Sequence, residues 1–138
     1  MKKTNTGVST EAIDLFQGEL GFELPSGYRK FLLQYNGGKF DAIFTCDVGE
    51  VMVDYMFGIG LQPNLDLRYW LKEFESDIIE NSLIIGADPG SGFFLLIVDF
   101  EDAGVYYYDQ SYRFSTSNDD ENTYLIDRDV SAFLSRLC

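Results

Sequence analysis

The middle of the chain, from residue 83 to residue 109, consists of short apolar runs separated by turn residues. The three runs are residues 83–86, 93–100 and 105–109. Each is too short for a helix of ordinary length and is rich in β-branched or aromatic residues, so we predict a three-stranded meander. Gly, Pro and Asp between the runs favour the reversals. Because the second run is apolar at successive positions, helices should cover both faces of its strand.

Four other stretches repeat apolar residues with the period of a helix, so that one face of each is buried. The four predicted faces contain Ile13, Phe16 and Leu20; Tyr28, Phe31, Leu32 and Tyr35; Leu67, Trp70, Leu71 and Phe74; and Val130, Phe133, Leu134 and Leu137. The residues expected to start these helices are Ser9 or Thr10, Pro25, Asn64, and Asp127 or Asp129. Gly21 should end the first helix and the Asn-Gly-Gly sequence at residues 36–38 the second, because glycine adopts the left-handed conformation of a helix end.

Two further regions favour strands. Residues 42–44 and 51–53 should form a hairpin around an intervening turn, and residues 123–126 should form a short strand. Strands thus cluster in the middle of the chain, with helices at both ends and one between them. This order favours a single α+β domain over residues 1–138, with residues 1–8 flexible, rather than a doubly wound parallel sheet.

The charge of the chain is strongly negative and unevenly distributed. The formal net charge is -13 at pH 7, and no Lys or Arg occurs between residues 40 and 67 or between residues 73 and 112. Such a field repels the phosphates of a nucleic acid and an anionic membrane, and it attracts a basic protein. The alternative is that the excess carboxylates only keep the protein soluble, and charge alone leaves both interpretations open.

The chain lacks the features of an exported or membrane-spanning protein. No segment reaches the roughly 18 apolar residues that cross a bilayer, and residues 1–7 lack the apolar region of a signal peptide. We therefore expect a cytoplasmic protein. Cys46 and Cys138 have no metal-ligand spacing, and we interpret both as free thiols.

Catalytic and phosphate-binding motifs are absent or incomplete. The sequence contains no histidine, which excludes a nucleophile activated by histidine. The Gly-Ile-Gly sequence at residues 58–60 lacks the third glycine of a dinucleotide site, and residues 86–92 carry Asp88 but no Lys, so we expect turns at both places. Asp88, Asp99 and Asp109 lie near strand ends, which leaves a pair of catalytic carboxylates as an alternative to turn formation.

A polar cluster at residues 118–122, Asn-Asp-Asp-Glu-Asn, resembles a calcium loop only in composition. It lacks the spaced oxygen ligands and the glycine of such a loop, and we expect a solvated loop instead. We therefore predict that the protein binds no metal and no cofactor and is not an enzyme.

Motifs in a specific order extend over nearly the whole chain. They are residues 13–24, Leu24-Pro25-Ser26-Gly27-Tyr28 with Phe31-Leu32, Asn36-Gly37-Gly38, Leu83-Ile84-Ile85-Gly86-Ala87-Asp88, the glycine-rich turn that follows, Val98-Asp99, residues 104–109, and a final helix from Asp129 to Leu137. In order and spacing they resemble the SUKH superfamily of bacterial toxin-immunity proteins, which also holds fungal regulators of cell-wall synthesis.

The resemblance implies an α+β fold with a mixed, mostly antiparallel sheet packed against N-terminal, middle and C-terminal helices, and no conventional active site. Most bacterial members look like immunity proteins that bind and neutralise the toxin domain of a polymorphic toxin system, frequently a nuclease. We therefore expect a basic cognate toxin domain as the partner, without direct contact to nucleic acid or membrane. The alternative that the resemblance implies is a non-catalytic regulatory scaffold or protein-binding module, similar to the fungal regulators.

Acidic loop residues and tyrosines are the candidate contacts to such a partner. Alternation along residues 106–108, three consecutive tyrosines, sends Tyr107 to the face opposite its neighbours, so that a phenol is available for a binding surface. The predicted partner-binding residues are Asp88, Glu101, Asp102, Tyr107, Asp119, Asp120 and Glu121.

Overall fold

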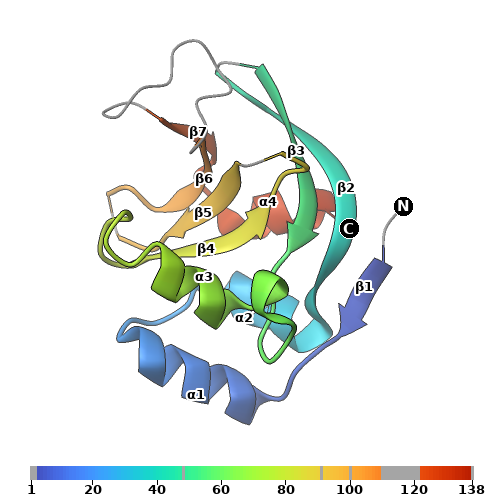
Figure 1. Cartoon of the computed structure of the whole chain (residues 1–138), viewed down its shortest axis with the longest axis vertical. Coiled ribbons are helices and arrows are strands. Elements are labelled where there is room, and N and C mark those ends of the chain that lie inside the picture. Colours follow the sequence, from blue (N-terminus) through green and yellow to red (C-terminus); the bar gives the residue numbers. More distant parts are fainter. Residues whose placement is uncertain (1–2, 48, 91, 100, 110–121, 138) are drawn as a thin grey trace.

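Seven strands form one sheet in which the spatial order of the strands follows their order in the chain (Figure 1). The computed structural model describes residues 3–47, 49–90, 92–99, 101–109 and 122–137. The elements are β1 (Lys3–Thr6), α1 (Thr10–Leu20), α2 (Ser26–Gln34), β2 (Tyr35–Cys46), β3 (Gly49–Met56), the 3-10 helix η1 (Pro63–Leu65), α3 (Leu67–Glu73), β4 (Ser82–Ala87), β5 (Phe93–Ile97), β6 (Gly104–Tyr108), β7 (Thr123–Asp127) and α4 (Val130–Leu137). The predicted α+β class, the central meander and the hairpin before it are confirmed.

All six neighbouring strand pairs are antiparallel, which corrects the expectation of a mixed sheet. The pairs β2–β3, β4–β5 and β5–β6 are hairpins, and a short connection can join only antiparallel strands. A parallel contact among the described residues is the isolated bridge between Gly58 and Asp66. β3 pairs with β4 only at Tyr55 and Met56, so the rest of the long β2–β3 hairpin extends beyond this pairing (Figure 1).

Helices cover both faces of the central strands, as the apolar run of β5 predicts. Every residue of β5 is buried. On one face α4 places Phe133 against Phe44 and Phe94, with ring centroids 4.6 and 6.2 Å apart. On the other face α3 and the residue after it place Trp70 and Phe74 against Phe93. Figure 1 shows α3 in front of the sheet and α4 behind it.

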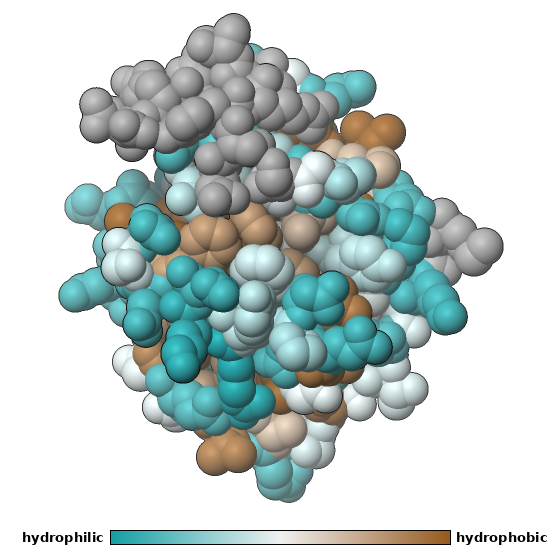
Figure 2. Space-filling model, in the orientation of Figure 1, coloured by the Kyte–Doolittle hydropathy of each residue, from teal (hydrophilic) through white to brown (hydrophobic). Residues whose placement is uncertain are grey.

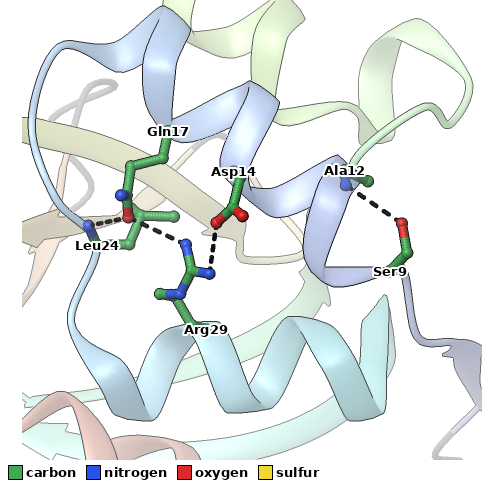
Figure 3. A network of polar contacts seen from close by, with 6 residues as sticks. All are labelled: Ser9, Ala12, Asp14, Gln17, Leu24 and Arg29. Carbon is green, nitrogen blue, oxygen red and sulfur yellow. Dashed lines mark hydrogen bonds and ion pairs between the residues drawn. The ribbon is translucent and has the colours of Figure 1, made fainter.

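A guanidinium group links the two N-terminal helices. Arg29 of α2 donates to Asp14 Oδ1 at 2.7 Å and to Gln17 Oε1 at 3.2 Å, and both acceptors belong to α1 (Figure 3). Gln17 Oε1 also accepts from the amide of Leu24 at 2.9 Å, in the connection between the helices. Arg29 therefore cross-links α1 and α2 through two acceptors of α1.

The predicted helix ends are largely confirmed. Ser9 Oγ accepts from the amide of Ala12 at 3.2 Å, and Gly21 ends α1 in the left-handed conformation with φ 79°. Asp129 Oδ1 accepts from the Ser131 amide at 2.9 Å at the start of α4. One exception is α3, which Asp66 caps rather than Asn64, because the intervening residues form η1 first.

Two segments differ from the sequence prediction because tertiary pairing decides their conformation. We expected residues 1–8 to be flexible, whereas Lys3–Thr6 pair with β2 as an edge strand. We expected residues 36–38 to end α2, whereas α2 ends at Gln34 and these residues belong to β2. Their glycines do have positive φ, 75° at Gly37 and 137° at Gly38. The predicted preference of these glycines for positive φ is therefore confirmed, but they lie at the start of a strand and not at the end of a helix.

Among the described residues, the hydroxyl of Tyr28 is the buried side-chain oxygen that lacks a hydrogen-bond partner. Burial raises the pKa of Tyr28 above its ordinary value of 10.0. Folding thus favours the neutral phenol. The contribution of this group to the free energy of unfolding is fully present below pH 10. As the pH rises from there toward the folded-state pKa, the free energy of unfolding falls by about 1.4 kcal/mol per pH unit.

Tyr28→Phe should therefore raise the free energy of unfolding by about 1 kcal/mol at pH 7, since it removes an unsatisfied buried group. It should also reduce the loss of stability above pH 10. Urea titrations at pH 7 and above pH 10 measure both effects. The control is Tyr35→Phe, which changes a half-buried phenol that accepts a hydrogen bond from Gln34. A Tyr28→Phe variant that is less stable at pH 7 would show that the hydroxyl has a stabilising partner.

Candidate interaction surface

The structure places two of the predicted contact residues, Asp88 and Tyr107, in the interior. Their exposed fractions are 5% and 0%. The Tyr107 hydroxyl donates to Asp88 Oδ2, and Asp88 Oδ1 accepts from the amides of Gly90 and Gly92 at 2.8 and 3.0 Å. Asp88 thus closes the turn between β4 and β5. As a correction, both residues are removed from the set of partner contacts, because a buried and mutually bonded pair presents no surface.

Gly92 in this turn is required by close packing. A Cβ atom at Gly92 would lie 2.0 Å from the Tyr107 hydroxyl, so any larger residue would separate Tyr107 from Asp88. Asp109, also considered for chemistry, is completely buried, and its amide donates to the Asn122 carbonyl at 2.7 Å. Among the described residues, no group of three or more Cys, Asp and Glu side chains is arranged to hold a metal ion.

The other predicted contacts have different outcomes. Glu101 and Asp102 are exposed in the turn between β5 and β6. Their backbone carbonyls accept hydrogen bonds from Arg128 at 3.4 Å and from Tyr106 at 2.9 Å, which holds the turn in place. Asp119, Asp120 and Glu121 lie outside the described residues. Their role stays a prediction.

The connection between α3 and β4, residues 74–81, is a further acidic surface that is not among the predicted contacts, and we call it the acidic ridge. At its start, Phe74 is buried, and its carbonyl accepts from the amides of Asp77 and Ile78 at 2.9 and 3.1 Å. At its end, the Asn81 carbonyl accepts from the Val98 amide at 2.9 Å, and the Ser82 hydroxyl donates to the Ile79 carbonyl. Hydrogen bonds within the ridge thus close its first turn, and the bond from the Val98 amide ties its end to the residue that follows β5.

Two hollows flank the ridge, and Ile78 and Ile79 line both of them. The sheet hollow, of about 430 Å³, lies between the ridge and strands β5 to β7. The helix hollow, of about 330 Å³, lies between the ridge and the residues of α1 and α3. The lining of the sheet hollow is Asp77, Ile78, Ile79, Leu95, Ile97, Tyr108, Asn122 and Thr123. The lining of the helix hollow is Leu20, Phe22, Leu71, Glu75, Ile78, Ile79, Glu80, Asn81 and Ser82.

The charge around the hollows has one sign. Asp77 lines the sheet hollow, Glu75 and Glu80 line the helix hollow, and neither lining contains a Lys or Arg among the described residues. Burial, and then the negative charge of Asp77, raises the pKa of Tyr108 above its ordinary value. Figure 2 shows an apolar area bordered by hydrophilic residues on the face that carries α3.

The sequence did contain a signal for this surface. Residues 73–80 read Glu-Phe-Glu-Ser-Asp-Ile-Ile-Glu, and they lie in a stretch without Lys or Arg. The carboxylates of these residues contribute to the acidic middle of the chain that the sequence shows. What could not be recognised is that Ile79 stays 55% exposed between two hollows, because that depends on strands that follow later in the chain.

Comparisons with known proteins agree with the fold and the motifs. Among curated proteins no significant match is found. The sequence profile of the SMI1 / KNR4 family (SUKH-1) matches residues 7–136, which extend from the residues before α1 into α4. The match includes the acidic ridge and the motifs from which the resemblance was inferred, except for Leu137, the last residue of the final one. The chain therefore belongs to the SMI1 / KNR4 family (SUKH-1).

Proposed function

We propose that this protein is an immunity protein that binds and neutralises the toxin domain of a bacterial polymorphic toxin system, and that the toxin is a nuclease. Membership of the SUKH superfamily supports a toxin-immunity or related protein-binding role. The proposal adds the class of partner, action in the cytoplasm, and inhibition without catalysis. Among the described residues, no helix is long and apolar enough to cross a membrane.

The observation that carries the proposal is the charge of the protein. A nuclease must bind phosphates, so its active site is lined by basic residues. A protein with a net charge of -13 is attracted to such a site over a distance and competes there with the nucleic acid. The exposed carboxylates of Glu101 and Asp102, and the ridge carboxylates Glu75, Asp77 and Glu80, supply this charge on the surface.

The proposal is tested by capture of the partner followed by protection from it. The tagged protein is used to capture binding partners from its own cells, with washes of increasing salt, and retained proteins are identified by mass spectrometry. A basic protein with a toxin domain should be retained and then released as salt rises. Co-expression of the captured domain with this protein should restore growth that the domain alone abolishes. Capture of several housekeeping proteins, without protection, would favour the regulatory scaffold.

Association with the captured toxin domain should depend on the acidic side chains of residues 119–121. Reversal of all three charges to Lys should slow association about tenfold at low salt, and the difference should nearly vanish at roughly 0.5 M salt. Stopped-flow mixing measures both rates. The matched control reverses Glu11, Glu23 and Glu50, which are exposed and change the net charge equally. Equal slowing by both variants would assign the effect to total charge rather than to residues 119–121.

A further inference from the structure

We infer that the acidic ridge and its two hollows form the docking surface for a partner protein that presents apolar side chains flanked by Lys or Arg. This inference rests on the proposed function for its biological setting, because it specifies where a basic partner would bind. The docking surface is defined by its apolar side chains and its carboxylates, however, so its binding can be tested without the toxin.

The apolar part of the argument concerns Ile79. Its side chain is 55% exposed and lies between the two hollows, with volumes of about 430 and 330 Å³. Single exposed apolar residues are common on protein surfaces and need no explanation. Ile43 is such a residue, 64% exposed on β2, and it lines neither hollow. Ile79 differs because a partner can cover it and fill the spaces on both sides in one contact.

The ridge is also ordered before any partner binds. Phe74 packs at its base against Trp70, Phe93 and Tyr108, with ring centroids 5.9, 5.0 and 5.8 Å away. Backbone hydrogen bonds close the first turn of the ridge and join its last residue, Asn81, to Val98. A surface that is already in its bound conformation loses little conformational entropy on binding.

Charge determines which chemistry fits this surface. Glu75, Asp77 and Glu80 belong to the ridge, and the described lining of the two hollows contains no basic residue. An anionic partner would therefore bury like charges against each other, whereas Lys and Arg side chains around an apolar centre would pair with the ridge carboxylates. Carboxylates around an apolar centre match the usual anatomy of an interface, with a polar rim around an apolar core.

The test uses a synthetic probe with the stated chemistry, a labelled amphipathic peptide of Lys and Leu about 14 residues long, roughly four helical turns. Its affinity is measured by fluorescence anisotropy for the wild type, for Ile79→Ser and for Ile43→Ser. The two variants make the same change at exposed isoleucines. Thermal melts verify that both are folded, which is expected because exposed substitutions have small effects on stability.

The peptide should bind the wild type and Ile43→Ser with equal affinity, and Ile79→Ser about tenfold more weakly. Binding should weaken with salt and should be lost when Glu replaces Lys in the peptide. Trp70, the single tryptophan of the chain, packs against Phe74 and reports occupation of the ridge through its fluorescence. Equal affinity for the two variants, or no binding of the peptide to the wild type, would overturn the inference.

Failure of this inference and failure of the proposed function give different results. A protein that protects cells from the toxin, while its Ile79→Ser variant binds the peptide as the wild type does, retains the function and loses the docking surface. A protein that binds the peptide through Ile79, but captures no toxin and protects against none, retains the surface and loses the function.

Discussion

Asp88→Ala should lower the free energy of unfolding by about 3–5 kcal/mol, one of the two largest effects that we expect from a substitution in this protein. The carboxylate accepts from two backbone amides and from the Tyr107 hydroxyl. Alanine would leave these donors without this acceptor inside the protein, and hydrogen bonds to a charged group contribute about 1.5–3 kcal/mol each. The β4–β5 turn would lose its main constraint. Urea denaturation at pH 7, with the midpoint and slope fitted separately, measures the change.

Two controls separate this effect from a general loss of charge. Tyr107→Phe removes one of the three donors and should lower the free energy of unfolding by about 1–2 kcal/mol. Asp102→Ala removes an exposed carboxylate and should change it by less than about 0.5 kcal/mol. If Asp88→Ala were no more destabilising than Asp102→Ala, the buried hydrogen bonds of this turn would not contribute to stability.

Asn36→Ala should lower the free energy of unfolding by about 2–4 kcal/mol. The side chain of Asn36 is buried, and its amide binds both backbone groups of Ile59: Oδ1 accepts from the amide at 2.7 Å and Nδ2 donates to the carbonyl at 2.8 Å. This pair of bonds fixes the segment after β3 against the start of β2. Alanine would leave the two backbone groups of Ile59 without these partners. The packing here is close, since a Cβ atom at Gly58 would lie 2.4 Å from the Asn36 carbonyl oxygen.

The matched control is Asn5→Ala, which removes one partly buried bond, from Asn5 Nδ2 to the Asn36 carbonyl at 3.1 Å. It should lower the free energy of unfolding by only about 0.5–1 kcal/mol. Asn36→Asp keeps the acceptor for the Ile59 amide but directs a second oxygen at the Ile59 carbonyl, so it should also be destabilising. Chemical denaturation of the three variants measures these values. Equal losses for Asn36→Ala and Asn5→Ala would contradict a special role of the buried amide.

The acidic residues of the protein divide into groups with different roles. Asp88 and Asp109 are buried and belong to the framework. Glu101 and Asp102 are exposed on a turn whose carbonyls accept hydrogen bonds from the side chains of Arg128 and Tyr106. The carboxylates of the acidic ridge surround an exposed isoleucine and two hollows. Only the last group combines charge with apolar surface, so it can provide affinity in addition to faster association.

The periodicity of apolar residues determined most of the fold. Residues 83–109 alternate apolar runs with Gly, Pro and Asp, and they form the predicted meander. The helical faces around Phe16, Phe31 and Phe133 are buried as predicted. These features could be read from the sequence because the repeat of a helix or strand and the preference of a turn residue involve only near neighbours.

The candidate site could be predicted only in part. The acidic character of the middle of the chain follows from composition, and Glu101 and Asp102 are exposed as a turn requires. The sequence predicts surface positions for Asp88, an acidic residue in a turn, and for Tyr107, a tyrosine on an alternating strand. Their bond joins residues 19 positions apart, and no local pattern indicates it.

The sequence by itself thus determined the elements, the family resemblance and the sign of the charge. Tertiary structure alone decided which polar residues are buried, that Lys3–Thr6 and residues 36–38 belong to strands, and that Ile79 lies between two hollows. The physical reason is the range of the interactions. Helix periodicity and turn preference act over a few residues, whereas burial of a carboxylate and the shape of a surface depend on segments that meet only when the sheet has formed.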